Sequence, residues 1–207
     1  MGEFESKVLE WLASGADDAK DIVDLPWNVQ PIEKGKYLAE HPRMPFQLLL
    51  VFTGDFVKLI VPFGLETISL DTSERMKLYR VLLKLNDGVN LMKFVLSGMN
   101  DEVYLRVDLD RKTLGKDEFN DALTALFMGL LTAVSALGLE EEFQRELFDR
   151  VVAMVLERLQ KGATPAEVKE FLTKKVGMDE KDAENLLEKI LEANTSQTYA
   201  GGDVGYF

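Results

Sequence analysis

Two apolar runs of strand length, FQLLLVF and FVKLIVPF, stand on either side of the turn sequence TGD. Apolar runs of this length around a short turn predict a β-hairpin. Both runs are apolar on nearly both faces, because Gln47 and Lys58 are the only polar residues in them. A strand that is apolar on both sides must have both sides covered. The chain therefore needs helices against one face of this hairpin. The other face needs a second chain, a client or the chain's own C-terminal part.

The segments around this hairpin predict further helices and strands. Residues 3–14 have apolar positions at helical spacing. The stretch WNVQPIEKGKYL is predicted to be one edge strand, because Pro31 lacks a ladder donor. Asp71 and Glu74 have the spacing of a capping box, which predicts a helix from there to about Leu85. The sequence NDG that follows is expected to end this helix.

A second hairpin follows that helix. Residues 91–97 and 102–110 read as two strands, and the return strand alternates strictly between apolar and polar side chains. Asp117 is expected to cap a further helix that runs to about Leu137. The predicted fold class is α+β, with an antiparallel sheet in the order α-β-β-β-α-β-β-α and a C-terminal helical bundle behind it.

The last third of the chain has a different character. Residues 140–193 show no strand pattern and predict three helices, one of which begins at Thr164 with Pro and then Glu behind it. Residues 140–207 carry half of the net charge of −12 on a third of the length. We therefore expect an α+β domain over residues 1–139, a three-helix region over 140–193 and a tail over 194–207.

Composition excludes several classes of function. A net charge of −12 repels nucleic acid, whose binding needs clustered Lys and Arg. No cysteine is present, so disulfides and Cys-ligated metal sites are excluded. The acidic start lacks the pattern of a signal peptide, and we expect a cytoplasmic protein. Many charges and few amides favour a thermophilic source. The uncharged run 122–139 has acidic flanks and many small residues, so we expect a core helix and no membrane span.

Few residues suggest chemistry. His41 is the only histidine, and the simplest interpretation makes it a polar loop residue. Asp108 and Asp110 lie on one face of a strand and could share a cation, but this spacing also occurs wherever a strand leaves the core. The sequence has no phosphate-binding glycine loop and no nucleophile elbow. We therefore expect no enzyme activity, no cofactor and no metal site.

One known fold matches the order of these elements. The segment LLKLNDGVNLMKFVLSGMNDEVYLRVDLDRKTLGKDEFNDAL, together with the two-sided strands, resembles the type III secretion chaperone-like fold. Its archaeal and bacterial relatives outside secretion, described as sensory-transduction regulators, are the nearest in pattern. The resemblance covers about residues 3–138. It implies a homodimer, because members of the fold usually are homodimers, and the secretion branch binds unfolded effector segments along its sheet.

These observations favour a non-enzymatic protein-binding or chaperone-like module with an apolar sheet face, which its own C-terminal region can cover. The expected partner-binding residues are Phe46, Leu48, Leu50, Val57 and Leu59 on the sheet, and Tyr206 and Phe207 in the tail. An alternative is an adaptor whose acidic C-terminal helices recruit a partner while the α+β domain dimerises. A third is an enzyme that uses His41 and nearby acids.

Overall fold

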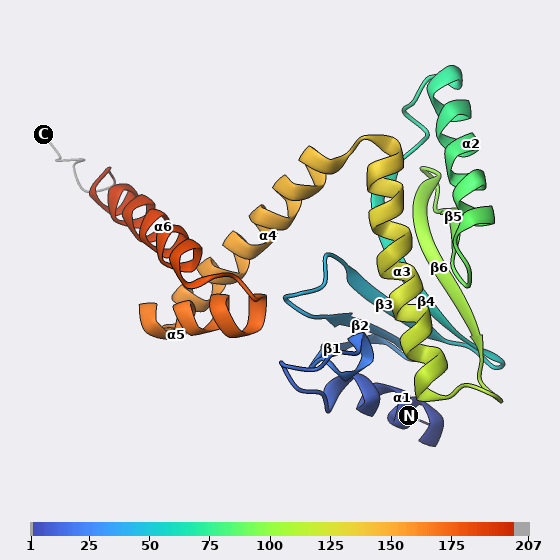
Figure 1. Ribbon diagram of the computed structural model, residues 1–207, viewed down its shortest axis with the longest axis horizontal. Helices are drawn as coiled ribbons and strands as arrows, with labels where there is room; N and C mark the ends of the chain where they lie inside the picture. The colour runs from blue at the N-terminus through green and yellow to red at the C-terminus, as the bar shows by residue number, and fades with distance from the viewer. Residues whose placement is uncertain (1, 201–207) are drawn as a thin grey trace, which may run out of the picture. The chain divides into compact units, whose positions relative to one another are not determined.

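The computed structural model describes residues 2–200, with side chains up to Glu192, and it divides the chain into two units. Unit 1 ends at Phe143 and combines helices with a sheet, whereas unit 2 begins at Gln144 and is helical (Figure 1). The predicted fold class, α+β with an antiparallel sheet and C-terminal helices, is confirmed.

Six antiparallel strands form the sheet of unit 1, in the order β1-β2-β3-β4-β6-β5. The elements along the chain are α1 (Glu3–Ala13), a 3-10 turn η1 (Ile22–Asp24), β1 (Asn28–Glu33), β2 (Lys36–Glu40), β3 (Gln47–Phe52), β4 (Phe56–Glu66), α2 (Thr72–Gly88), β5 (Lys93–Ser97), β6 (Glu102–Asp110) and α3 (Lys116–Leu137). β3 and β4 are the predicted hairpin of the two apolar runs, and β5 and β6 are the second hairpin.

The sheet has one strand more than the sequence predicted. WNVQPIEKGKYL folds as a hairpin of β1 and β2 and not as a single edge strand. Its turn passes through Gly35, whose φ of 74° is a left-handed conformation that glycine adopts without a steric penalty. Lys36 pairs with Glu33 across this turn. Pro31 does lie on an edge strand, as expected, because β1 pairs only with β2.

Helix α2 begins as predicted and ends later. The Asp71 carboxylate accepts a hydrogen bond from the Glu74 backbone N–H at 2.9 Å, which confirms the capping box. The expected end near Leu85 is wrong, because the helix continues through NDG to Gly88. The Asn86 side chain bonds to β5 and leaves the helical backbone intact.

Helix α3 has a different start from the one predicted. Its N-cap is Gly115, which has no side chain to accept a bond, and Asp117 lies inside the first turn. An acidic residue there still interacts favourably with the helix dipole. The predicted end at Leu137 is confirmed, and Gly138 follows in a left-handed conformation.

The three helices α1, α2 and α3 contact one face of the sheet and enclose the core of unit 1 (Figure 1). From α3 this core receives eight residues: Phe119, Ala122, Leu123, Leu126, Gly129, Leu130, Ala133 and Val134. Among the helices that the structure describes, α3 is long and apolar enough to cross a membrane, but a core helix passes the same test. Its burial makes it the predicted core helix.

Unit 2 has a separate hydrophobic core. It consists of α4 (Glu140–Gln160), which starts at the end of unit 1, then α5 (Pro165–Glu170), a π-helical turn (Phe171–Val176) and α6 (Glu180–Ala200). The predicted start at Thr164 is confirmed by a capping box. The Arg158 guanidinium lies 3.5 Å from the centre of the Phe171 ring, a cation–π contact within this unit. The predicted anchors Tyr206 and Phe207 lie outside the described residues.

Candidate interaction surface

The five sheet residues predicted to bind a partner lie in the core of unit 1. Phe46 is 5% exposed, and Leu48, Leu50, Val57 and Leu59 have no exposed area. They point toward the helices that enclose this core. Because successive residues of a strand point to opposite faces, the residues between them point to the other face. Side chains without exposed area cannot meet another chain in this conformation. The accessible side of the sheet is therefore the opposite one, which we call the outer face.

An apolar row crosses the outer face. Leu38 on β2 lies opposite Leu49 on β3, and Leu49 lies opposite Ile60 on β4. All three side chains are half-buried, as is Val51, which follows two residues after Leu49 on the same face. We call Leu38, Leu49 and Ile60 the outer apolar row. Strands are about 4.8 Å apart, so this row is about 10 Å long.

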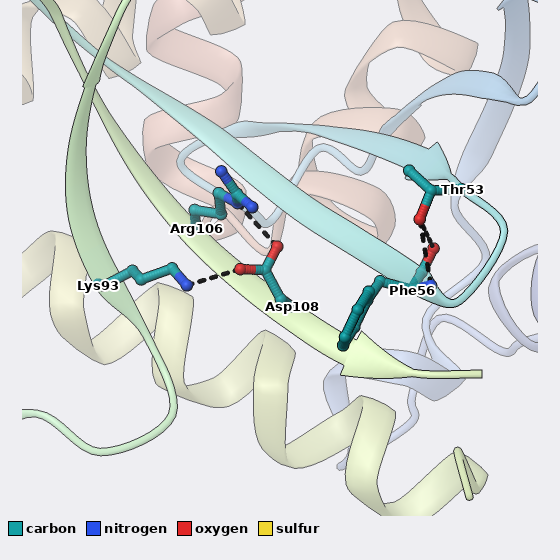
Figure 2. A network of polar contacts seen from close by, with 5 residues as sticks. All are labelled: Thr53, Phe56, Lys93, Arg106 and Asp108. Atoms are coloured by element: carbon teal, nitrogen blue, oxygen red, sulfur yellow. Dashed lines mark hydrogen bonds and ion pairs between the residues drawn. The ribbon is translucent and has the colours of Figure 1, made fainter. Parts of the chain in front are cut away.

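Charged side chains continue the same line of residues beyond β4. Ile60 lies opposite Arg106 on β6, and Arg106 lies opposite Lys93 on β5. Asp108 on β6 accepts from Arg106 Nε at 2.7 Å and from Lys93 Nζ at 2.6 Å (Figure 2). Partial burial alone would raise the Asp108 pKa, but the hydrogen bonds from Arg106 and Lys93 outweigh it and hold the pKa below its ordinary value. The Asp108 carboxylate, which the sequence offered as a cation ligand, is thus already bonded to two cationic side chains.

Lys58 adds a third cation to this part of the face. It lies opposite Val51 on one side and Asp108 on the other, and its side chain is half-buried. Among the residues that the structure describes, Lys58 forms no ion pair. We call Lys58, Lys93 and Arg106 the basic cluster. Asp108 lies among these cations, and Asp110 and Glu102 lie farther along the same face of β6.

The outer edge of β5 is closed by a side chain. Asn86 Oδ1 accepts from the Phe94 backbone N–H at 2.6 Å, and Asn86 Nδ2 donates to the Phe94 carbonyl at 3.3 Å. The amide thus takes the place of a neighbouring strand at this residue. At the other edge, β1 contains Pro31, which has no N–H to offer. Both edges are poor templates for an added strand.

His41, the residue considered for catalysis, is buried in unit 1. His41 is 1% exposed, its ring centre lies 6.1 Å from that of Trp27, and its Nδ1 accepts from the Arg43 backbone N–H at 3.2 Å. It is in the predicted loop but is buried there. Within the described part of the chain, no three potential metal ligands lie together.

A small hollow of about 130 Å³ is found on unit 1, where the pairing of β4 with β6 is irregular. Its lining residues are Pro62, Gly64, Leu65, Glu66, Glu102, Val103 and Tyr104. The Tyr104 hydroxyl donates to the Glu102 carboxylate, and this hydrogen bond, together with burial, raises the Tyr104 pKa. The hollow is below the usual volume of a small-molecule site.

Sequence reasoning missed the outer face as the accessible one and missed the role of Asn86. The signal for the first was present, since Leu38, Leu49 and Ile60 are the apolar residues of opposite parity in the same strands. For Asn86 the sequence offered only a helix-stop pattern, because its partner is eight residues away on another element.

Comparison with known proteins gives families without a described function. A family model named DUF8183, described as a domain of unknown function, matches residues 7–137. A second model, HTH_78, also described as a domain of unknown function, matches residues 138–201. No curated protein matches the chain.

One solved structure similar to part of this chain is a chain in the structure of the heterodimeric complex ExoU-SpcU from the type III secretion system of Pseudomonas aeruginosa. The two chains are 16% identical, the match covers 61% of this chain and 93% of that one, and the TM-score is 0.39.

Proposed function

The chain belongs to the DUF8183 family, and we propose that it is a non-enzymatic, chaperone-like protein-binding module that receives its partner on the outer face of the sheet. The outer apolar row is the observation that carries this proposal. Three aliphatic side chains stand in line across three strands, on the face that α1, α2 and α3 do not contact.

Covering this row would be favourable. Each half-buried aliphatic side chain still exposes a few tens of Å², and removing that area from water contributes about 1 kcal/mol. A partner that lies against the sheet therefore gains binding free energy from the row, and any apolar segment would bind there with modest affinity. Such weak, unselective binding is what a chaperone-like module requires.

The aggregation of heat-denatured citrate synthase, followed by light scattering, tests this proposal. The full-length protein is expected to suppress the aggregation. Ile60→Glu places a charge in the outer apolar row and should abolish most of this effect. Leu83→Glu is the matched control, because Leu83 is an exposed leucine of α2, 69% accessible and outside the row. Equal suppression by wild type and Ile60→Glu would remove the outer face as the binding surface.

The C-terminal segment 194–207 is proposed to cover the outer face when no partner is bound, with Tyr206 and Phe207 as anchors. Aromatic side chains are frequent anchors in interfaces. Deleting residues 194–207 should then increase the binding of an apolar dye to the full-length protein. Unchanged dye binding would exclude residues 194–207 as a cover of the outer face, but it would not contradict the outer face as the binding surface.

The adaptor is a second candidate, favoured by the separate core of unit 2. The described part of α6 exposes five acidic side chains (Glu180, Asp182, Glu184, Glu188 and Glu192) against two lysines (Lys181 and Lys189). This surface suits a basic protein partner and disfavours nucleic acid. The adaptor also requires unit 1 to form the predicted homodimer, which light scattering on the full-length chain would detect. If the chain is a monomer, the adaptor is excluded and only the first candidate remains.

A further inference from the structure

One row of paired residues across the outer face is apolar in its first half and basic in its second half. The outer apolar row occupies β2, β3 and β4, and its line of paired residues continues directly into Arg106 on β6 and Lys93 on β5. Lys58 stands on β4 beside the boundary. The two halves therefore follow one another across the strands, and each is about 10 Å wide at the usual strand spacing.

The basic half has unused hydrogen-bond donors. Asp108 engages Arg106 through Nε and Lys93 through Nζ. Among the described residues, the two Nη groups of Arg106 and the ammonium of Lys58 have no partner. At Asp108 three cations meet one carboxylate, so this part of the half is positively charged, whereas Asp110 and Glu102 lie toward the two ends of β6 on the same face. The whole chain has a net charge of −12. An incoming carboxylate would thus gain charge-assisted hydrogen bonds at little cost.

The sheet edges exclude one common binding mode. An added strand at β5 would need the Phe94 backbone groups, and Asn86 already holds both of them. A strand added at β1 would meet Pro31. A partner must therefore lie across the face and make its contacts through side chains.

We propose that the outer face takes a peptide segment with an apolar stretch adjoining an acidic stretch, which lies across the strands with its apolar part on β2–β4 and its carboxylates over the basic cluster. The full width of about 20 Å corresponds to roughly 6 residues of extended chain or roughly 13 residues of helix. This inference rests on the proposed function and adds the chemistry of the partner.

Two synthetic peptides test the proposal against the full-length protein by isothermal titration calorimetry. One has four leucines followed by four glutamates, and its control has four leucines followed by four lysines. The first is expected to bind about tenfold tighter or more, as one or two charge-assisted hydrogen bonds would give. The preference should shrink as salt rises from about 0.05 to about 0.5 M.

Matched charge variants locate the effect. Lys58→Glu should remove or reverse the preference for the glutamate peptide. Lys84→Glu, on the exposed surface of α2, changes the net charge equally and should leave the preference intact. Deleting residues 194–207 should tighten the binding of both peptides if that segment competes for the face.

The possible failures are distinct. Equal binding of both peptides that Ile60→Glu abolishes would overturn the acidic preference and leave the proposed function standing. Tighter binding of the lysine peptide, or a preference that Lys58→Glu does not change, would also overturn it. Binding of neither peptide to the chain without residues 194–207 refutes this inference, and the citrate synthase assay then decides on the proposed function by itself.

Discussion

Removing the Asn86 side chain should destabilise unit 1 and open the edge of β5. Asn86→Ala takes away an acceptor at 2.6 Å and a donor at 3.3 Å from the backbone of Phe94, a residue that is 7% exposed. A net hydrogen bond contributes about 1 kcal/mol, and a buried group left without a partner costs about 1–3 kcal/mol. Because water can reach an edge strand once the side chain is gone, we expect the lower part of that range, about 2 kcal/mol for the pair.

Tryptophan fluorescence during urea unfolding measures this loss in the right unit. Trp11 and Trp27 are the two tryptophans of the chain, and both lie in unit 1, so the signal is blind to unit 2. In thermal unfolding the same loss corresponds to roughly 5–10 °C. Hydrogen exchange at the Phe94 amide should accelerate in the variant, because its acceptor is gone.

Asn90→Ala is the matched control, since Asn90 is exposed and makes no side-chain hydrogen bond to any residue that the structure describes. Asn86→Asp should be intermediate, because a carboxylate still accepts from the Phe94 N–H but cannot donate to its carbonyl. The reasoning is refuted if Asn86→Ala unfolds within about 0.5 kcal/mol of wild type and the Phe94 amide exchanges at the same rate.

Three further predictions concern other positions. Asp108→Asn should cost about 1 kcal/mol near neutral pH, because the ion pairs are partly exposed. The folded-state pKa of Asp108 is lowered, so its stabilisation is present above the unfolded carboxyl pKa and is lost as pH falls through the folded pKa; a difference from the variant that does not shrink in acid would contradict this. Thr164→Ala removes the N-cap of α5 and should cost about 1 kcal/mol, seen by far-ultraviolet circular dichroism but not by tryptophan fluorescence. Gly15→Ala should destabilise unit 1 by about 3 kcal/mol, more than Gly129→Ala at about 1–2 kcal/mol. A Cβ at Gly15 would clash with backbone atoms, whereas a Cβ at Gly129 would clash with the movable Met92 side chain. If urea unfolding showed the larger loss of stability for Gly129→Ala, the backbone near Gly15 would yield more easily than the Met92 side chain.

Local signals in the sequence predicted local structure well. The spacing of Asp71 with Glu74 placed the start of α2, and Thr164 placed the start of α5. Both are capping boxes, in which every bonded partner lies within three residues. Such motifs need no tertiary information, so the sequence contains all that determines them.

Signals that depend on distant partners failed. NDG was expected to end α2, but Asn86 bonds to β5 and the helix continues to Gly88. WNVQPIEKGKYL was expected to be one strand, but its turn at Gly35 became clear only from the pairing of β1 with β2. In each case the residue type is compatible with two local structures, and pairing with a neighbouring element determines which one forms.

The choice between the two faces of the sheet was the largest error of the sequence reasoning about the site, and its cause is one of parity. β3 and β4 are apolar on both faces, so their own pattern cannot tell which set of side chains meets the helices. The strictly alternating strand β6 resolves this, because its apolar face has to be the core face. Its buried Val107 lies opposite Leu59, and Leu59 lies opposite Leu50, so this row of residues faces the core from β6 to β3.

Had β6 been paired with β4 in the prediction, Leu50 and Leu59 would have been assigned to the core and Leu49 and Ile60 to the outer face. One strand with a clean alternation thus fixes the parity of every strand in register with it. By the same logic the outer apolar row is not required by the core, because unit 1 already has a complete core on the other side. Its three aliphatic residues therefore call for an explanation outside the packing of unit 1, and a partner with an apolar stretch provides one.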